Sequence, residues 1–507
     1  RQRHLTIPCE MCIRDRYKRE MMTNNSATRF LRQTVFILLL IFDYSSQSVR
    51  SHSRSVNNIK KNVHHNQKHH HHHQQRVLLI SLSGFRYDYI EAYNLKHIAS
   101  FGKDGVKAAY LNSQFNSQTV PNHWSMVTGA HLEAHGIVAD SFYDSELKET
   151  FSKHKAEPKW WNTSEPIWYT AARQGVRTAV NTWPGCSVQF DEDETALENY
   201  RYILLDNYAN VEKKFDLSLK WILNDQIQFT AIYEHQLDSI SRKYGINTPE
   251  FNVTLNEIDE KFGQLVGKIK ACGLYDSDSF NLVLVSDHGM ANIKKYIFVN
   301  DYMNDTDAQI VSFGSTLIHL KPLIRLEHLL MKLSRMPNVT ILLRDRLPEA
   351  LFYKSSHRIG DLLLSAEEGV SFLQTSKGPV FANLNGQMSK LDLTYEQKKM
   401  MSKLSADKAT SGYDGAYASM RGIFMAHGAM FKSHHSSLNH LQNVDIYPLL
   451  CTLLSIECDK RNGSFDRVRE FLKHEYRLHV TSQKQKMIQN GTTRLAAEVE
   501  ALRVAPN

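Results

Sequence analysis

Short apolar runs separated by longer stretches of mixed polarity mark the chain from Val77 onward. In five of these runs the apolar residues are continuous rather than alternating. The runs are VLLISL (77–82), VRTAVNTW (176–183), FTAIYEH (229–235), FNLVLVS (280–286) and GIFMAHG (422–428). Strands buried on both faces of a parallel sheet have this character, because helices cover both faces. The pattern therefore predicts five strands of a mostly parallel central sheet.

The stretch 254–273 lies between two predicted strands and has the period of a helix. Its apolar side chains recur on one helical face. They are Leu255, Ile258, Phe262, Leu265, Val266 and Ile269. Thr254 and Glu257 fit a capping box at the start, and Gly273 fits a C-terminal stop. Strand, helix and strand in this order predict an α/β fold with helices on both faces of the sheet.

Polar side chains follow three of the predicted strands. Ser83 comes directly after the first strand, Asp238 follows the third, and Asp287 and His288 follow the fourth. In α/β sheets, ligands bind beyond the carboxyl ends of the strands. We therefore expect these side chains to share one site.

A hydroxyl group stands at the start of a second predicted helix. The segment SQTVPNHWSMVTGA (117–130) places Thr119 two residues before Pro121. A threonine there either caps the helix or, beside a divalent cation that lowers the pKa of its hydroxyl, acts as a nucleophile. Together with Asp287 and His288, Thr119 indicates a metal-assisted site.

Residues 21–48 have the features of a signal peptide. Arg29 and Arg32 precede an eight-residue apolar run (35–42), and small residues at 46–48 fit a cleavage site. Eight apolar residues are too few to cross a bilayer, which needs ~20. The sequence thus predicts a cleaved signal peptide and a secreted, extracellular protein, with a short signal anchor as the alternative.

The rest of the chain divides by composition. We expect residues 1–20 to be upstream sequence that is not native to the protein. Residues 49–76 are a His-rich, nearly non-apolar stretch that predicts a disordered linker, with metal scavenging by its histidines as the alternative. The folded domain is expected over 77–465. Residues 466–507 form a polar tail without a membrane anchor.

Charge and composition limit the kinds of function that are expected for the chain. The 507 residues are 42% hydrophobic and 22% charged, which is typical of a globular protein. The formal net charge of +8 comes largely from lysines and arginines near the two ends. No basic stripe interleaved with aromatic residues is present, so nucleic acid is not an expected partner.

Cysteines and glycosylation sequons agree with secretion. Six N-x-S/T sequons follow the predicted signal peptide, which predicts a glycoprotein. They begin at Asn162, Asn252, Asn304, Asn338, Asn462 and Asn490. The four cysteines of the expected domain allow three disulfide connectivities. A local pair of Cys451 with Cys458 would leave Cys186 with Cys272.

A series of motifs, in order, covers the predicted domain. They include SLSGFRYDY, TVPNHWSMVTG, HGIVADSFYD, EPIWYTAARQG, NLVLVSDHGM, KKYIFVNDYM and SGYDGAYASMRGIFMAHG. From about Val77 to Phe465 the chain resembles the ectonucleotide pyrophosphatase/phosphodiesterase family of the alkaline phosphatase superfamily. The resemblance implies an alkaline phosphatase-like α/β fold, with a mostly parallel central sheet flanked by helices on both faces.

The resemblance also implies a chemistry. The family hydrolyses phosphodiester or pyrophosphate bonds of nucleotides or lysophospholipid-type substrates, using two zinc ions and a threonine that forms a covalent intermediate. On the motifs of this chain, the catalytic threonine corresponds to Thr119. The first metal pocket corresponds to Asp238 with positions 242 and 411. The second corresponds to position 83, Thr119, Asp287 and His288.

Four of the corresponding positions depart from the family pattern. Ser83 stands in place of an aspartate ligand, and Arg242 and Ser411 stand in place of histidine ligands. Asp140 replaces the asparagine that steadies a phosphoryl oxygen and would line the substrate-binding site. As a carboxylate, Asp140 would repel phosphate or serve as a replacement metal ligand.

These departures decide the expected metal content. A catalytic zinc ion normally has three protein ligands. The first pocket keeps only Asp238, while the second keeps Asp287, His288 and Thr119. We expect at most one weakly held zinc ion, or none. Arg242 is expected to pair with Asp238 and to replace the charge of the lost ion.

Two functional hypotheses follow. In the first, the protein is a pseudoenzyme: a secreted, catalytically impaired or inactive homologue that binds a nucleotide, a phospholipid-like molecule or an extracellular protein partner. In the second, it is an active metal-dependent phosphodiesterase that hydrolyses nucleotide or phospholipid phosphodiester bonds through a covalent intermediate on Thr119. The loss of three metal positions favours the first.

Overall fold

The computed structural model describes residues 75–190, 194–204, 210–375, 380–384, 387–391, 394–474 and 476. The expected upstream segment, the signal peptide, and most of the linker and of the tail lie outside these residues. The described part begins at the first strand of the central sheet. It continues beyond the predicted end of the domain to Phe471 and Leu472, which are buried.

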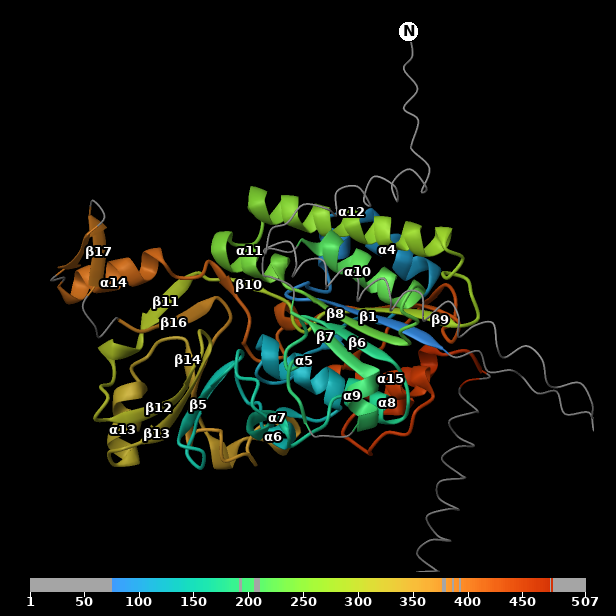
Figure 1. Ribbon diagram of the computed structural model, residues 1–507. Helices are drawn as coiled ribbons and strands as arrows, with labels where there is room; N and C mark the ends of the chain where they lie inside the picture. The colour runs from blue at the N-terminus through green and yellow to red at the C-terminus, as the bar shows by residue number, and fades with distance from the viewer. Residues whose placement is uncertain are drawn as a thin grey trace, which may run out of the picture. The chain divides into compact units, whose positions relative to one another are not determined.

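An eight-stranded sheet forms the centre of the fold (Figure 1). Its order is β21 (His435–Ser436), β2 (Val106–Lys107), β20 (Phe424–Gly428), β9 (Phe280–Val285), β1 (Arg76–Leu82), β8 (Phe229–Glu234), β6 (Thr178–Asn181) and β7 (Tyr200–Ile203). The five strands from β9 to β7 are parallel. All five predicted strands are present, which confirms the mostly parallel sheet.

The predicted strand at 422–428 differs from the others in direction. It forms β20, which pairs antiparallel with β9. Its first three residues, Phe424 to Ala426, are nevertheless buried, so that this part has the same continuous apolar character as the parallel strands.

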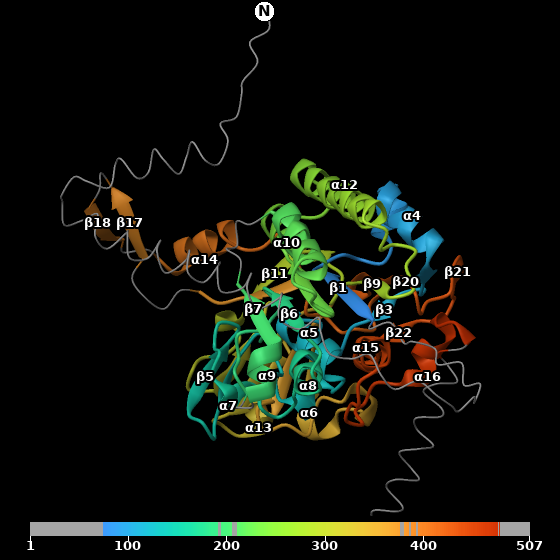
Figure 2. The same cartoon turned by 45° about the vertical axis from the view of Figure 1, so that its right-hand side comes forward.

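Helices cover both faces of the sheet, as expected (Figures 1 and 2). On one face lie α4 (Lys96–Asp104), α10 (Val211–Leu223), α11 (Gln236–Tyr244) and α12 (Pro249–Ala271). On the other lie α5 (Thr119–Thr128), α8 (Ile167–Arg173) and α15 (Ile446–Leu454). Leu78 and Ile80 of β1 pack into the first core, and Val77 and Leu79 pack into the second. Alternate residues of one strand thus enter two apolar layers, which explains its continuous apolar sequence.

Helix α12 begins earlier than predicted. Its N-cap is Thr248, whose side chain accepts a hydrogen bond from the backbone N–H of Phe251, and Pro249 follows at the first helical position. The predicted capping box at Thr254 is therefore wrong. Thr254 is buried inside the helix. The predicted stop is confirmed, because Gly273 has φ +70° just after the helix.

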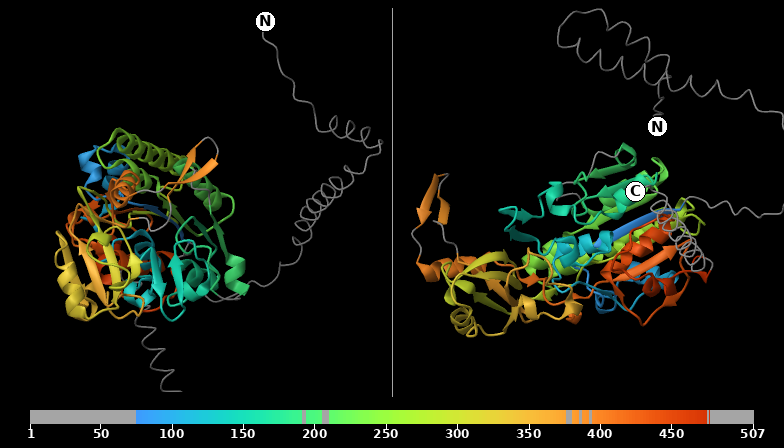
Figure 3. Two further views of the ribbon diagram at one scale, coloured as in Figure 1. Left: turned by 90° about the vertical axis from the view of Figure 1, so that its left-hand side faces the viewer. Right: turned by 90° about the horizontal axis from the view of Figure 1, so that it is seen from below.

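A second, smaller sheet lies beside the central one (Figure 3). It is antiparallel, in the order β12 (Ala308–Phe313), β13 (Leu317–Pro322), β15 (Leu362–Ala366) and β14 (Val339–Leu343), and it packs against α13 (Leu326–Leu333). The hairpin of β4 (Ser141–Asp144) and β5 (Glu149–Ser152) contacts β12, where Ser312 Oγ donates to the carbonyl of Ser141 at 2.7 Å.

Shorter elements complete the described part of the chain. The helices are α3 (Tyr89–Ala92), α6 (Leu132–His135), α7 (Pro158–Trp161), α9 (Glu194–Asn199), α14 (Tyr395–Leu404) and α16 (Phe465–Val468). The strands are β3 (Leu111–Asn112), β10 (Ala291–Asn292), β11 (Lys295–Phe298), β16 (Val370–Leu373), β17 (Val380–Leu384), β18 (Gln387–Leu391), β19 (Ala409–Thr410) and β22 (Leu441–Gln442). None of the described helices is both long and apolar enough to cross a membrane.

One of the two expected disulfides is present. Cys451 and Cys458 are joined, which confirms the local pair. The pairing of Cys186 with Cys272 is wrong, since both thiols are free. Cys186 is buried in the core that contains α5 and α8, whereas Cys272 is exposed after α12 on the opposite face of the sheet. The central sheet thus separates the two residues.

Candidate functional site

The residues predicted to form a site lie at the carboxyl edge of the central sheet. Ser83 follows β1, and Asp287 and His288 follow β9. Asp238 is in the first turn of α11, after β8, and Thr119 is the first residue of α5. At Gly84 (φ +73°), a Cβ would lie 3.3 Å from the Asp238 Cα, so the loops after β1 and β8 are in close contact.

The first half of the site is built around Asp238. The Arg242 guanidinium binds this carboxylate in a bidentate manner, with Nε 2.8 Å from Oδ2 and Nη2 3.2 Å from Oδ1. The Nη2 group also donates to Ser411 Oγ at 2.9 Å. The pairing of Arg242 with Asp238 expected from the sequence is confirmed. One guanidinium therefore joins the three positions that the family resemblance assigns to a metal ion.

Helical spacing explains this geometry. Asp238 and Arg242 are four residues apart on α11, so their side chains lie on the same helical face. Burial lowers the pKa of Arg242, but the charge of Asp238 and its hydrogen bonds raise that pKa above its ordinary value. Arg242 is therefore a permanent cation. Both oxygens of Asp238 already accept its hydrogen bonds.

The second half of the site is built around the buried carboxylate of Asp287. Its Oδ2 accepts from Ser83 Oγ at 3.0 Å, and its Oδ1 accepts from the backbone N–H of Gly84 at 3.2 Å. The Oδ2 atom also lies 3.1 Å from His288 Nε2 and 3.3 Å from His123 Nδ1. The Asp287 oxygens thus face protein groups on several sides.

His123 is a site residue that the sequence reasoning missed. It lies in the first half of α5, and its Nε2 is 2.9 Å from Ser81 Oγ on β1. Burial lowers its pKa, which favours the neutral ring. Its place one turn after Thr119 was the available signal, because residues four apart on a helix share a face.

His288 connects the two halves. Its Nε2 lies 3.0 Å from Thr119 Oγ1 and 3.4 Å from Ser411 Oγ, and its Nδ1 lies 2.7 Å from the carbonyl oxygen of Gly289. Burial lowers the pKa of His288, but the charge of Asp287 outweighs burial and raises it. Both ring nitrogens thus face acceptors, the arrangement that favours an imidazolium.

The pKa of Asp287 agrees with a protonated His288 ring. Burial raises the pKa of the carboxyl group, but His288 and His123 lower it by more, to about 2. Asp287 and His288 therefore form a buried ion pair. An imidazolium has no lone pair with which to take the proton of the Thr119 hydroxyl, although the two side chains are within hydrogen-bond distance.

The side chain of Asp140, which is not part of α5, contacts the first turn of this helix. Its Oδ1 accepts the backbone N–H of Val120 at 2.8 Å, and its own N–H donates to Gln118 Oε1 at 2.7 Å. Burial raises the pKa of this carboxyl group, while the hydrogen bond from Val120 opposes the rise. The carboxylate thus occupies a helix-terminal N–H that an anionic ligand would otherwise use.

The donor set does not fit a pair of zinc ions. Among the residues that the structure describes, no group of three or more His, Cys, Asp or Glu side chains is arranged to hold a metal ion. A metal-ligand role for Asp140, beside Asp287 and His288, stays a prediction. The oxygens of Asp238 bind Arg242, and those of Asp287 bind Ser83, Gly84 and the histidines.

Comparison with known proteins gives a consistent set of relatives. Residues 77–414 match the family described as type I phosphodiesterase / nucleotide pyrophosphatase. Mouse bis(5'-adenosyl)-triphosphatase enpp4 is 31% identical over 409 residues, covering 78% of this chain and 80% of the relative. Human ectonucleotide pyrophosphatase/phosphodiesterase family member 5 is 28% identical over 404 residues, covering 78% of each chain.

Two solved structures of a murine relative are also similar to this chain. The murine ectonucleotide pyrophosphatase/phosphodiesterase 5 superposes with a TM-score of 0.68 at 27% identity, over 79% of this chain and 100% of that one. An inactive form of the same murine protein, in complex with AMP, gives a TM-score of 0.68 at 26% identity, over the same shares of the two chains.

Proposed function

The chain belongs to the type I phosphodiesterase / nucleotide pyrophosphatase family, with the alkaline phosphatase-like fold of that family, and we propose that it is a secreted member with an impaired or inactive catalytic site. It would act by binding rather than by turnover. The ligand class that its relatives suggest is a nucleotide, since a murine relative is solved in complex with AMP. A phospholipid-like molecule or an extracellular protein partner is the alternative.

The observation that carries this proposal is the position of Arg242. Its guanidinium lies between Asp238 and Ser411 and donates to both. A divalent cation there would have to displace a permanent positive charge from its carboxylate partner. Breaking a partly buried, bidentate ion pair is costly, so the guanidinium disfavours the metal.

The charge balance of the site supports the same conclusion. Asp140, Asp238 and Asp287 contribute three carboxylates, while Arg242 and the His288 imidazolium contribute two cations. In a two-metal site, the ions supply the positive charge that binds phosphoryl oxygens and stabilises the transition state. Without such ions, Arg242 would be the main fixed cation near the substrate, which favours binding over turnover.

Thr119 keeps its position but lacks activation. Its hydroxyl faces His288, whose pKa Asp287 raises, and a proton on both ring nitrogens would prevent this ring from acting as a base. A threonine hydroxyl needs a base or a metal to become a nucleophile at neutral pH. Neither is provided by the donor set described above.

Exposed sequons support passage through the secretory route. The asparagines at positions 162, 304, 338 and 462 are exposed, so a glycan at each would extend into solvent. Asn252 is half-buried within α12, and Asn490 lies outside the described residues. The disulfide between Cys451 and Cys458 fits an oxidising compartment.

The alternative, an active metal-dependent phosphodiesterase, has one observation in its favour. Thr119, His288 and Asp287 form an unbroken chain, with 3.0 Å from Thr119 to His288 and 3.1 Å from His288 to Asp287. A single ion that displaced the His288 proton would restore part of the family chemistry.

Metal content and turnover decide between the two. The protein secreted from eukaryotic cells would be analysed for zinc by mass spectrometry and tested on a nitrophenyl nucleotide ester. We expect zinc far below one ion per chain, and the same background turnover in wild type and in Thr119→Ala. Near-stoichiometric zinc with turnover abolished by Thr119→Ala would contradict the proposal.

A restored variant provides the matched control. Combining Ser83→Asp, Arg242→His and Ser411→His returns the ligand types that the family resemblance assigns to these positions. We expect this variant to bind zinc where the wild type does not. If wild type and restored variant hold equal amounts of zinc, Arg242 is not what excludes the metal.

A further inference from the structure

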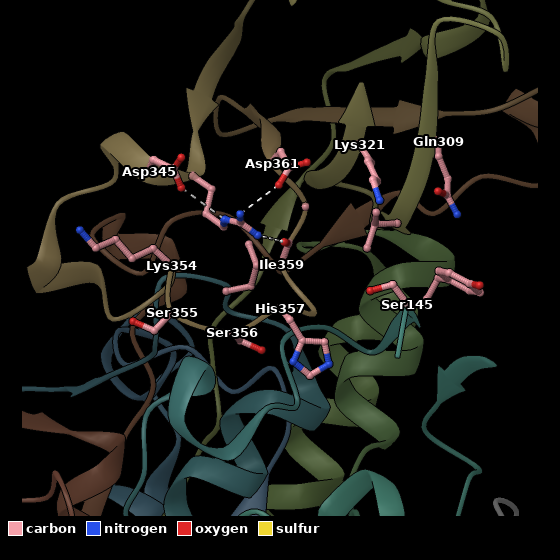
Figure 4. Close-up of a pocket in the computed structure, with 14 residues that line it drawn as sticks. Ser145, Gln309, Lys321, Asp345, Lys354, Ser355, Ser356, His357, Ile359 and Asp361 are labelled. Atoms are coloured by element: carbon pink, nitrogen blue, oxygen red, sulfur yellow. Dashed lines mark hydrogen bonds and ion pairs between the residues drawn. The ribbon is translucent and has the colours of Figure 1, made fainter. Parts of the chain in front are cut away.

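A cavity of about 400 Å³ lies away from the carboxyl-edge site, and none of the site residues lines it (Figure 4). It is bounded by the β4–β5 hairpin, by β12 and β13 of the small sheet, and by the segments 344–345 and 354–361. These segments are distant in sequence and meet in the folded chain. A cavity of this volume accommodates a ligand of one or two sugar-sized rings.

Most charged groups of the cavity wall already have partners. Arg344 Nη2 lies 3.0 Å from Asp361 Oδ1, its Nε lies 3.6 Å from Asp345 Oδ1, and its Nη1 donates to the carbonyl of Ile359. Figure 4 shows both carboxylates directed toward this guanidinium. Arg344, Asp345 and Asp361 thus form a structural cluster, and their charges are largely spent on one another.

Three other basic side chains line the cavity, and two of them have acidic partners. Lys354 forms an ion pair with Glu349, and His357 Nε2 lies 3.2 Å from Asp144 Oδ2. The third is Lys321 on β13. Among the described residues, no carboxylate lies within 4.0 Å of its ammonium group. Its charge is available to a ligand.

Lys321 has a neutral neighbour that can also donate hydrogen bonds. It lies opposite Gln309 in the antiparallel register of β12 and β13, and both side chains line the cavity. Figure 4 shows them extending side by side from the two strands. An ammonium and an amide at this spacing can both donate to one carboxylate. The same pair would hold a monovalent anion at this end of the cavity.

The remaining lining is suited to hydroxyl groups. Ser145, Ser355 and Ser356 add hydroxyls that donate and accept, and Tyr143 adds an aromatic side chain. Apolar contacts are restricted to a few residues such as Val311 and Ile359. A purely apolar ligand would leave these hydroxyls and the ammonium without partners, which is unfavourable.

We propose that this cavity binds a sugar that carries a carboxylate, with Lys321 and Gln309 on the carboxylate and the serine hydroxyls on the ring hydroxyls. Among the described lining residues, Lys321 is the lysine or arginine without an ion pair, and one such cation matches a monovalent anion better than a phosphate dianion. The sugar would be either a free monosaccharide acid or the terminal residue of a glycan. This inference is independent of the proposed function, because the two sites share no residue.

Titration calorimetry on the full secreted chain, after enzymatic deglycosylation, tests the proposal. The probes are free glucuronic acid, free N-acetylneuraminic acid, an oligosaccharide that ends in each acid, neutral galactose, and inorganic phosphate. We expect saturable binding of an acidic sugar and none of galactose. Tighter binding of the oligosaccharide than of the free acid would identify a glycan as the source, and the reverse would identify the free acid.

Variants assign the binding to the cavity. We expect Lys321→Gln to weaken binding of the acidic sugar at least tenfold, since it removes the unpaired cation. The matched control is Lys220→Gln, which removes an exposed lysine on α10 and should leave affinity unchanged. Equal affinity of wild type and Lys321→Gln, binding of galactose as tight as that of the acids, or preference for phosphate would each overturn the proposal.

Discussion

In the two halves of the carboxyl-edge site, the positions that the family resemblance assigns to metal ligands are substituted in different ways. Around Asp238, a histidine position has become Arg242, whose guanidinium now holds the carboxylate. Around Asp287, Ser83 stands at an expected aspartate position, and the carboxylate accepts hydrogen bonds from Ser83 and Gly84 and lies within 3.3 Å of two histidine rings. One half has gained a fixed cation, while the other retains an ionised histidine.

This difference shows that a buried carboxylate needs a partner whatever the site does. An uncompensated buried charge is strongly unfavourable, so the loss of a cation must be accompanied by another source of positive charge or hydrogen bonds. The half in which both expected histidine positions are substituted contains an arginine. The half that contains His288 has a histidine ring beside its carboxylate instead.

The largest expected effect is the removal of Asp287. It is fully buried, and its loss would leave the Ser83 hydroxyl and the Gly84 N–H without their acceptor and His288 without its carboxylate partner. We expect Asp287→Ala to lower the free energy of unfolding by about 3–5 kcal/mol, measured by urea denaturation. For Asp238→Ala we expect about 1–2 kcal/mol, because Arg242 remains a quarter exposed and retains Asp407 at 3.5 Å.

A surface carboxylate provides the control for this comparison. Asp216→Ala removes an exposed partner of Lys268 and should change stability by less than about 0.5 kcal/mol. If Asp238→Ala costs as much as Asp287→Ala, the two halves do not differ in the way described.

Acid should weaken the Asp287 half selectively. The pKa of Asp287 is about 2 in the folded protein, below the ordinary value of 3.8. Between these values the unfolded chain binds more protons, so stability falls as the pH is lowered. The contribution is complete above pH ~4 and lost near pH ~2, and it amounts to roughly 2 kcal/mol.

The variant Asp287→Asn isolates this contribution. Urea unfolding of wild type and variant at several pH values between 5 and 3 should give a stability difference that narrows as the pH falls. Circular dichroism at each pH would confirm that both proteins start from the native state. A difference that stays constant over this range would show that the folded-state pKa is not depressed.

The smallest effect concerns the pairing in the Asp238 half. In a double-mutant cycle of Asp238→Ala and Arg242→Ala, we expect a coupling energy of about 1–2 kcal/mol, since the bidentate pair is only partly exposed. The exposed pair Asp216 and Lys268 is the control cycle, with an expected coupling below about 0.5 kcal/mol. Additive costs for Asp238 and Arg242 would show that no functional pairing exists.

Prediction of the fold from the sequence succeeded where burial is complete. The five apolar runs are strands because each is enclosed by helices on both faces. The small antiparallel sheet was not predicted. Its edge strands β12 and β14 are partly exposed and have mixed polarity, but its central strands β13 and β15 are largely buried and were also missed. The start of α12 was also misplaced. Thr254 and Glu257 satisfy a capping pattern, but Thr248 and Pro249 provide a stronger start.

The candidate site was predicted from residue types, from the order of the predicted elements and from helical spacing. Asp238, Asp287 and His288 were placed at strand ends by the order of the elements, and Arg242 was paired with Asp238 by helical spacing. His123 was missed because nothing local links a helix histidine to a carboxylate 164 positions later. The Asp140 hydrogen bond to Val120 was missed for the same reason.

The sequence by itself determined the layered α/β class, the family resemblance and the identities of the substituted metal positions, because these depend on local periodicity and on motifs. Only the tertiary structure decided how the substituted residues compensate one another. Hydrogen bonds between Arg242 and Ser411, between Ser83 and Asp287, and between His288 and Thr119 join residues that are far apart in the chain. Such contacts exist only when the sheet brings the ends of β1, β8 and β9 to one edge.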